Sequence, residues 1–160
     1  MKPATAQDTR NTIFQLLKET FEGPPSGEPS AFIEKGTGLF QTLNEISAEI
    51  ASTQTRPGGA TIASHSEHVR FYVDVHYELM RGSTAKIKWA ESWRIQKLNT
   101  KEWDELRLGL RQVYFTLNEY LRAIESWSEN EIGLGMSIVA HTAYHLGAIR
   151  QLVLVARGNG

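Results

Sequence analysis

Helical periodicity is the feature that most constrains this chain. Apolar side chains recur three and four residues apart in four long stretches, and each stretch has one apolar face. We expect helices at about residues 7–22, 60–81, 99–127 and 128–156, with a short connecting helix at 39–51. Strand signals are weak throughout. The sequence therefore predicts an all-α fold, and four such helices favour a four-helix bundle.

Helix-terminating residues support these boundaries. Three pairs have the spacing of an N-terminal capping pair: Thr5 with Asp8, Asn99 with Glu102, and Ser128 with Glu131. Gly23, followed by two prolines, ends the first helix, and Gly82 is suited to end the second.

The lengths of the connections constrain the topology. The third and fourth helices adjoin almost directly, so we expect them to be antiparallel. Residues 83–98 contain Trp89 and Trp93 but no clear period. This segment can extend roughly 50 Å at ~3.3 Å per residue, whereas a helix of about 22 residues is only ~33 Å long. We therefore expect a long crossover that makes the second and third helices parallel and the fourth antiparallel to both.

Composition bounds the function. We expect one domain over residues 1–160. Seventeen Lys and Arg balance eighteen Asp and Glu, which argues against nucleic acid as a partner. Without cysteine, the chain cannot form a disulfide, an iron–sulfur cluster or a thiolate zinc site. The polar start and the lack of 18 uninterrupted apolar residues predict a cytoplasmic protein with no membrane partner.

The five histidines are concentrated on two predicted helices. His65, His68 and His76 lie on the second, and His141 and His145 lie four residues apart on the apolar face of the fourth. A buried polar group without a partner costs on the order of 1–3 kcal/mol. A shared metal ion would satisfy both rings of the His141–His145 pair, since imidazole is a common metal ligand. The alternative is that both are core histidines bonded to Tyr, Ser or backbone groups.

Helix arithmetic indicates a third ligand. His68 lies ~20 Å from the end of its helix, and the midpoint of His141 and His145 lies ~22 Å from the start of theirs. In antiparallel helices these three rings fall at one level. His65 lies about one turn away, and His76 lies more than two turns away, which predicts a core or surface role for it.

Two motifs carry a family resemblance. The run Gly58-Gly59-Ala60-Thr61-Ile62, followed by His68, and the His-x-x-x-His run within residues 139–151 resemble the DinB/YfiT-like superfamily of metal-binding four-helix bundles. The resemblance covers nearly the whole chain and implies a single DinB-like domain with His68, His141 and His145 as metal ligands. Ala60 stands where an aromatic residue is usual. The resemblance also implies a homodimer.

The chemistry follows from such a site. Three histidines leave coordination positions open, as in catalytic zinc centres, and zinc or nickel suits imidazole ligands. The superfamily is similar in fold to mycothiol-dependent maleylpyruvate isomerase and bacillithiol transferases. The resemblance therefore implies transfer of a low-molecular-weight thiol, or metal-assisted hydrolysis, on a small-molecule substrate. The alternative is a non-catalytic helical-bundle dimer with a structural or vacant metal site, and the sequence leaves this choice open.

Three neighbours are candidates to support the metal ligands. Tyr72 lies one turn after His68, Ser64 lies on the same face of that helix, and His65 is the third candidate. Tyr72 could equally be a core aromatic residue, and Ser64 could simply be an early helix residue.

For other residues near the histidines, the sequence predicts structural roles. Glu67 and Asp74 are expected to face solvent, and Tyr144 to contact a neighbouring helix. Trp89 and Trp93 could form a lid or pack over the open end of the core.

Overall fold

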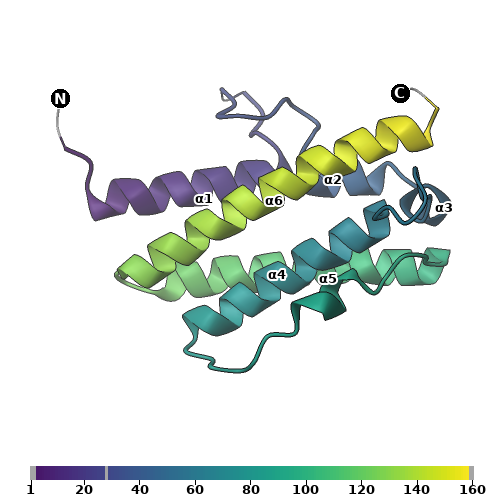
Figure 1. Ribbon diagram of the computed structural model, residues 1–160. Coiled ribbons are helices and arrows are strands. Elements are labelled where there is room, and N and C mark those ends of the chain that lie inside the picture. The colour runs from purple at the N-terminus through teal and green to yellow at the C-terminus, as the bar shows by residue number, and fades with distance from the viewer. Residues whose placement is uncertain (1–2, 28, 159–160) are drawn as a thin grey trace.

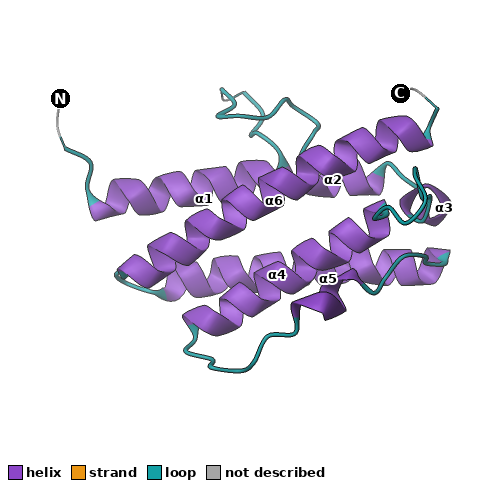
Figure 2. Cartoon of the chain, in the orientation of Figure 1, coloured by secondary structure: helices purple, strands orange, loops and turns teal. Residues whose placement is uncertain are grey.

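The computed structural model describes residues 3–27 and 29–158, and all regular structure within them is helical (Figure 2). The prediction of an all-α fold is therefore confirmed. The elements in chain order are α1 (Ala6–Glu22), α2 (Leu39–Asn44), α3 (Ala48–Ala51), α4 (Ile62–Met80), the short 3₁₀ helix η1 (Trp89–Trp93), α5 (Thr100–Ala123) and α6 (Glu129–Ala156).

The long helices α1, α4, α5 and α6 lie lengthwise along the molecule (Figure 1). In this view α1 and α6 run from left to right, whereas α4 and α5 run from right to left. Residues 81–99, called here the 81–99 segment, lead back along the molecule and carry η1. The helix α4 packs against both α5 and α6, and η1 packs against α4.

Side-chain caps explain where the long helices begin. Thr5, Asn99 and Ser128 each accept a backbone N–H and form the reciprocal capping box that the sequence predicts. A fourth box, between Thr61 and Ser64, starts α4. Gly23 ends α1 at a φ of 88°, a conformation that favours glycine.

Two predicted boundaries are wrong. Residues 39–51 form two helices, because Ser47 caps a new helix by accepting from the Ile50 N–H at 3.3 Å. The helix expected to reach Trp127 ends at Ala123. The Arg10 guanidinium donates to the Leu121 and Arg122 carbonyls at 3.1 Å each, so these carbonyls are satisfied without a further helical turn.

The core beneath α1, α2 and α5 is aromatic and aliphatic. The Phe21 and Tyr114 rings stack at 4.5 Å, and Phe40 meets Tyr114 edge-on at 5.4 Å. All three are buried together with Leu17 of α1 and the leucine stripe of α5. Such dense apolar burial is the main stabilising contribution to folding.

A buried carboxylate holds the loop that follows α1. Glu19 is 1% exposed. It accepts backbone N–H bonds from Ala31, Phe32 and Ile33 at 2.7–2.9 Å and a hydroxyl bond from Ser30 at 2.9 Å. Burial disfavours the charged form, but these hydrogen bonds outweigh it and hold the pKa of Glu19 below its usual value.

The helix α6 is the most apolar element. It is long and apolar enough to span a membrane on length and composition alone, with one third of that stretch buried inside the protein. A core helix of a water-soluble protein has the same property. Its buried face packs on α1 and α4 and carries the histidine pair.

Candidate metal centre

Three histidines from two helices meet inside the molecule. One ring nitrogen from each of His68, His141 and His145 lies within 4.8 Å of the other two. The ring centres are 4.9 Å apart for His68–His141 and His68–His145, and 4.4 Å apart for His141–His145. His68 and His145 are buried, and His141 is half-buried. The structure thus brings together the three rings that helix arithmetic places at one level.

The positions of these rings follow from local sequence. On α6, His141 and His145 continue the stripe of Ile138 and Ile149, both fully buried. On α4, His68 precedes the fully buried Val69. Helical periodicity therefore turns the imidazoles into the core, and contact between α4 and α6 brings them together.

The 81–99 segment fixes the tautomer of His68. His68 Nδ1 lies 2.6 Å from Ser92 Oγ. The Ser92 hydroxyl donates its proton to the Trp89 carbonyl at 2.7 Å, so it accepts from His68. His68 therefore carries its proton on Nδ1 and leaves Nε2 as the free acceptor. A partner of this kind orients a metal-binding imidazole.

The other two rings also present Nε2. His145 Nδ1 bonds His65 Nδ1 at 2.9 Å, which leaves Nε2 of His145 without that partner. His141 Nε2 is buried and has no hydrogen-bond partner among the described residues. Since buried polar atoms are nearly always satisfied, this orphaned nitrogen requires an explanation.

The imidazoles are held neutral. Burial, and then the neighbouring histidines, lower the pKa of His141 to about 4 and that of His145 to about 3. Burial also lowers the pKa of His68, with a smaller contribution from His65. At neutral pH all three rings therefore have a lone pair available, which is the form that a metal ion requires.

Aromatic rings enclose the cluster. Trp93 of η1 stacks on His68 at 4.1 Å, and Tyr72 stacks on His141 at 3.6 Å. Behind Tyr72, His76 stacks at 3.8 Å and donates from Nδ1 to the Tyr72 carbonyl at 2.9 Å. His76 is buried, so it takes the core role that was one of its two expected roles.

Three further expectations can be compared with the structure. Ser64 hydrogen-bonds to Thr61 at the start of α4, so its hydroxyl is engaged in the cap. Glu67 was expected to face solvent, but this is wrong: it is 9% exposed and pairs through two bonds of 2.7 Å with Arg70. Tyr144 was expected to contact another helix and is instead 73% exposed.

Sequence reasoning missed Ser92. Its residue type and its place in an aperiodic stretch carry no signal of a role beside His68. The Trp89–Trp93 pair that flanks it was the only hint, and η1 indeed packs on α4.

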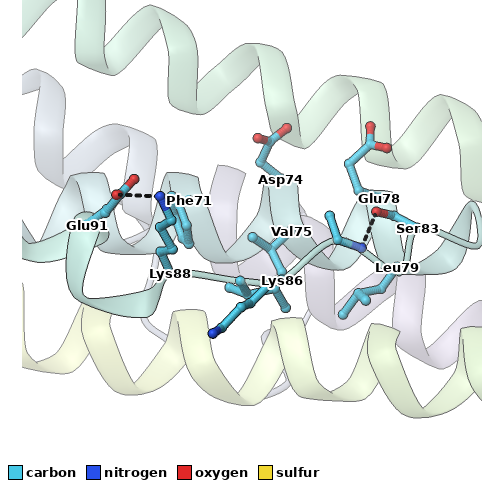
Figure 3. Close-up of a pocket in the computed structure, with 11 residues that line it drawn as sticks. Phe71, Asp74, Val75, Glu78, Leu79, Ser83, Lys86, Lys88 and Glu91 are labelled. Carbon is cyan, nitrogen blue, oxygen red and sulfur yellow. Dashed lines mark hydrogen bonds and ion pairs between the residues drawn. The ribbon is translucent and has the colours of Figure 1, made fainter.

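A separate hollow lies on the outer side of α4 (Figure 3). It has a volume of about 260 Å³ between α4 and the 81–99 segment. Asp74 and Glu78 project to one side of it and Lys86 to the other, while Lys88 pairs with Glu91 at 3.8 Å. The charged groups do not converge on a common point, and no histidine lines this hollow. We therefore place the candidate chemistry at the histidines.

Comparison with known protein families, with curated proteins and with solved structures finds no match. The chemistry of the donor set therefore carries the functional argument. Ring nitrogens bound to zinc at ~2.0–2.1 Å in a tetrahedron lie about 3.3 Å apart. Small ring movements would bring the three nitrogens, now within 4.8 Å of each other, to that spacing.

Proposed function

We propose that this protein is a divalent-metal protein whose ion, zinc or nickel, is held by His68, His141 and His145. The observation that carries the proposal is the convergence of three neutral imidazoles, two buried and one half-buried, and the half-buried His141 has an orphaned Nε2. Hydrogen bonds at Nδ1 of His68 and His145 favour Nε2 of each as the ligand atom. The sequence has no cysteine, and among the described residues the candidate group contains only histidines, which favours a metal that accepts nitrogen ligands.

The proposal extends to fold and family. We interpret α1, α4, α5 and α6 as a four-helix bundle and the 81–99 segment as its long crossover. The parallel course of α4 and α5 supports this interpretation (Figure 1). Together with the motifs around His68 and at residues 139–151, it supports membership of the DinB/YfiT-like superfamily.

We further propose that the site is catalytic and acts on a thiol or on water, as a thiol transferase or a hydrolase. A bound zinc or nickel ion supplies Lewis-acid chemistry, which lowers the pKa of a thiol or a water at its open position. The chain supplies the orientation: Ser92 holds the His68 ring, and His65 holds the His145 ring. Trp93 and Tyr72 keep bulk water away from the imidazoles.

Elemental analysis of the purified protein tests the metal site. We expect about one divalent ion per chain, and we expect it to be lost in His141→Ala and in His145→Ala. The matched control is His76→Ala, which removes a buried histidine that does not belong to the three-histidine group and should retain the ion. An unchanged metal content in both His141→Ala and His145→Ala would refute the site.

Activity assays separate the catalytic proposal from the non-catalytic alternative. Metal-dependent turnover of a thiol-acceptor or ester substrate, abolished by His68→Ala and kept in His76→Ala, is the expected result. If removing the metal changes only the melting temperature and no turnover is found across a broad panel, the ion is structural.

We also propose that the protein is a homodimer formed through the outer face of α6. No Asp, Glu, Lys or Arg occurs between Glu131 and Arg150, and Met136 and Tyr144 are mostly exposed on this face. Exposed apolar side chains on an uncharged surface are typical of association sites. Light scattering should give twice the chain mass, and Tyr144→Glu should give a monomer. A wild-type monomer at micromolar concentration would exclude the dimer.

A further inference from the structure

A second pocket lies next to the three-histidine cluster. His65, which hydrogen-bonds to His145, is one of the residues that line it. The pocket has a volume of about 290 Å³ and lies between residues 55–60, the start of α4 and the last third of α6. Its polar groups include Arg56, His65 and Gln151. Its apolar wall includes Ala148, Leu152 and Val155. None of the described residues that line it is acidic, so the pocket combines one positive charge with an apolar wall.

The Arg56 side chain is seated by the glycine turn. A Cβ atom at Gly59 would lie 2.6 Å from Arg56 Cγ, closer than real contacts allow. The missing side chain at Gly59 therefore leaves the space in which Arg56 lies. No carboxylate of the described residues lies within ion-pair distance of Arg56, in contrast to Arg70, Arg81 and Arg94. An arginine without a partner at a pocket is suited to bind an anion through paired N–H groups.

His65 adds a second donor to the same pocket. Its Nδ1 is engaged with His145 Nδ1 at 2.9 Å. If His145 binds a metal through Nε2, its proton lies on Nδ1 and is donated to His65. His65 Nδ1 is then the acceptor, so the neutral His65 ring carries its own proton on Nε2. This leaves Nε2–H of His65 as a donor for a ligand in the pocket.

The volume of the pocket limits the size of the ligand that it can bind. A water molecule occupies ~30 Å³ in the liquid, so the pocket holds a ligand of about ten non-hydrogen atoms. Charge requires an anionic group at Arg56, and the wall formed by Ala148, Leu152 and Val155 favours a short aliphatic tail. We propose that this pocket binds a small aliphatic carboxylate, with its carboxylate on Arg56 and His65 and its tail against α6.

The pocket is coupled to the candidate metal centre, and this part of the proposal rests on the proposed function. His145 would bind the ion through Nε2 and donate its Nδ1–H to His65, and His65 would donate its Nε2–H to the carboxylate. A carboxylate that accepts from a ligand histidine's partner makes that ligand more basic. Carboxylate and metal should therefore strengthen each other's binding, and thermodynamic linkage requires the two factors to be equal. The site would then take a substrate, or a regulatory ligand, with a carboxylate.

Calorimetry on metal-stripped protein tests the pocket itself. Hexanoate should bind saturably, whereas hexanamide, its neutral counterpart of equal size, and inorganic phosphate should bind at least tenfold more weakly. Arg56→Gln should weaken hexanoate binding at least tenfold. Arg94→Gln, which makes the same charge change at an exposed arginine away from the pocket, should leave it unchanged. Equal binding of hexanamide or phosphate, an unaffected Arg56→Gln protein, or no hexanoate binding would overturn the proposal.

A second titration tests the coupling. Saturating hexanoate should raise the zinc affinity of the wild-type protein several-fold and leave that of Arg56→Gln unchanged. An unaltered wild-type zinc affinity would overturn the coupling. If the protein binds neither zinc nor nickel, the proposed function fails, whereas the measurement on metal-stripped protein still decides whether the pocket takes a carboxylate.

Discussion

Two regions of this molecule bury polar side chains, and they differ in the hydrogen-bond partners that the chain provides for them. Glu19 carries a charge into the interior, and three backbone N–H groups and a hydroxyl surround it. In the cluster of His68, His141 and His145, two rings are buried and His141 is half-buried, yet the His141 Nε2 has no partner within the described residues. One region is satisfied by the chain itself, and the other presents lone pairs to a common space.

The contrast favours the histidine cluster as the site where a metal ion could be held. The loop at residues 30–33 shows that this fold can direct several donors at one buried acceptor. At the histidine cluster, by contrast, no donor within the described residues is directed at His141 Nε2. Three imidazole lone pairs that face one space suit a cation, because a single cation can accept all of them at once.

The largest difference between the two regions is expected in how acid changes the free energy of unfolding. In the unfolded chain histidine takes a proton near pH 6.5, whereas His141 and His145 resist it down to about pH 4 and about pH 3. With a chelator present, the unfolded state then binds more protons, so the free energy of unfolding falls as the pH drops below 6.5. At ~1.4 kcal/mol per pKa unit, the loss due to His145 is on the order of 4 kcal/mol by pH 3.

Glu19 should act in a lower pH window. Its pKa is held below the ordinary value of 4.5, so its contribution is complete above pH 4.5 and falls only as the pH drops further. Urea titrations between pH 7 and 3 measure both effects. His145→Leu should flatten the upper part of the curve and Glu19→Gln the lower part. A wild-type curve without a slope between pH 6.5 and 5 would contradict the assignment of neutral, buried histidines.

Replacing Glu19 should cost more than replacing an exposed glutamate. Glu19→Gln removes the charge and puts an amide N–H against backbone donors, so we expect a loss of about 2 kcal/mol, as for a broken charge-assisted bond. Glu119→Gln on the exposed side of α5 is the matched control and should change stability by less than about 0.5 kcal/mol. Equal effects in urea unfolding would mean that the carboxylate does not hold the loop.

Removing the Ser92 hydroxyl should loosen the metal site without unfolding it. Ser92→Ala deprives His68 Nδ1 of its acceptor, and loss of such a partner lowers metal affinity by about 10–100-fold. Ser83→Ala, which removes a hydroxyl elsewhere in the 81–99 segment, should leave the affinity unchanged. Competition against a zinc indicator measures both. The Ser92 role is disproved if the two variants bind zinc alike.

The smallest effect is expected for an apolar replacement in the cluster. In protein freed of metal by a chelator, His141→Leu replaces an unsatisfied buried nitrogen with an apolar group of similar size. We expect stability to be unchanged or to rise by about 1 kcal/mol. This is the reverse of the result at Glu19. A loss of several kcal/mol would show that His141 has a structural partner inside the fold.

Sequence predicts what depends on short-range periodicity. The capping pairs and the level of His68, His141 and His145 follow from fixed helical geometry. The break at Ser47 and the early end of α5 depend on a local cap and on Arg10, which reaches the end of α5 from α1. Glu67 shows the same limit: its position on α4 predicted exposure, but pairing with Arg70 allows it to be buried. Ser92 was missed because it contacts His68 from a segment that has no period.

The candidate ligands come from α4 and α6, with all of α5 between them in the chain. During synthesis, His68 therefore cannot meet the other two imidazoles until α6 has emerged and docked on α4. A chain that ends before α6 has only His68 of the three ligands. A chain in which α6 has not docked presents His141 and His145 apart from His68. Either chain should bind the ion poorly. Occupancy by the ion would thus report that α6 has docked on α4.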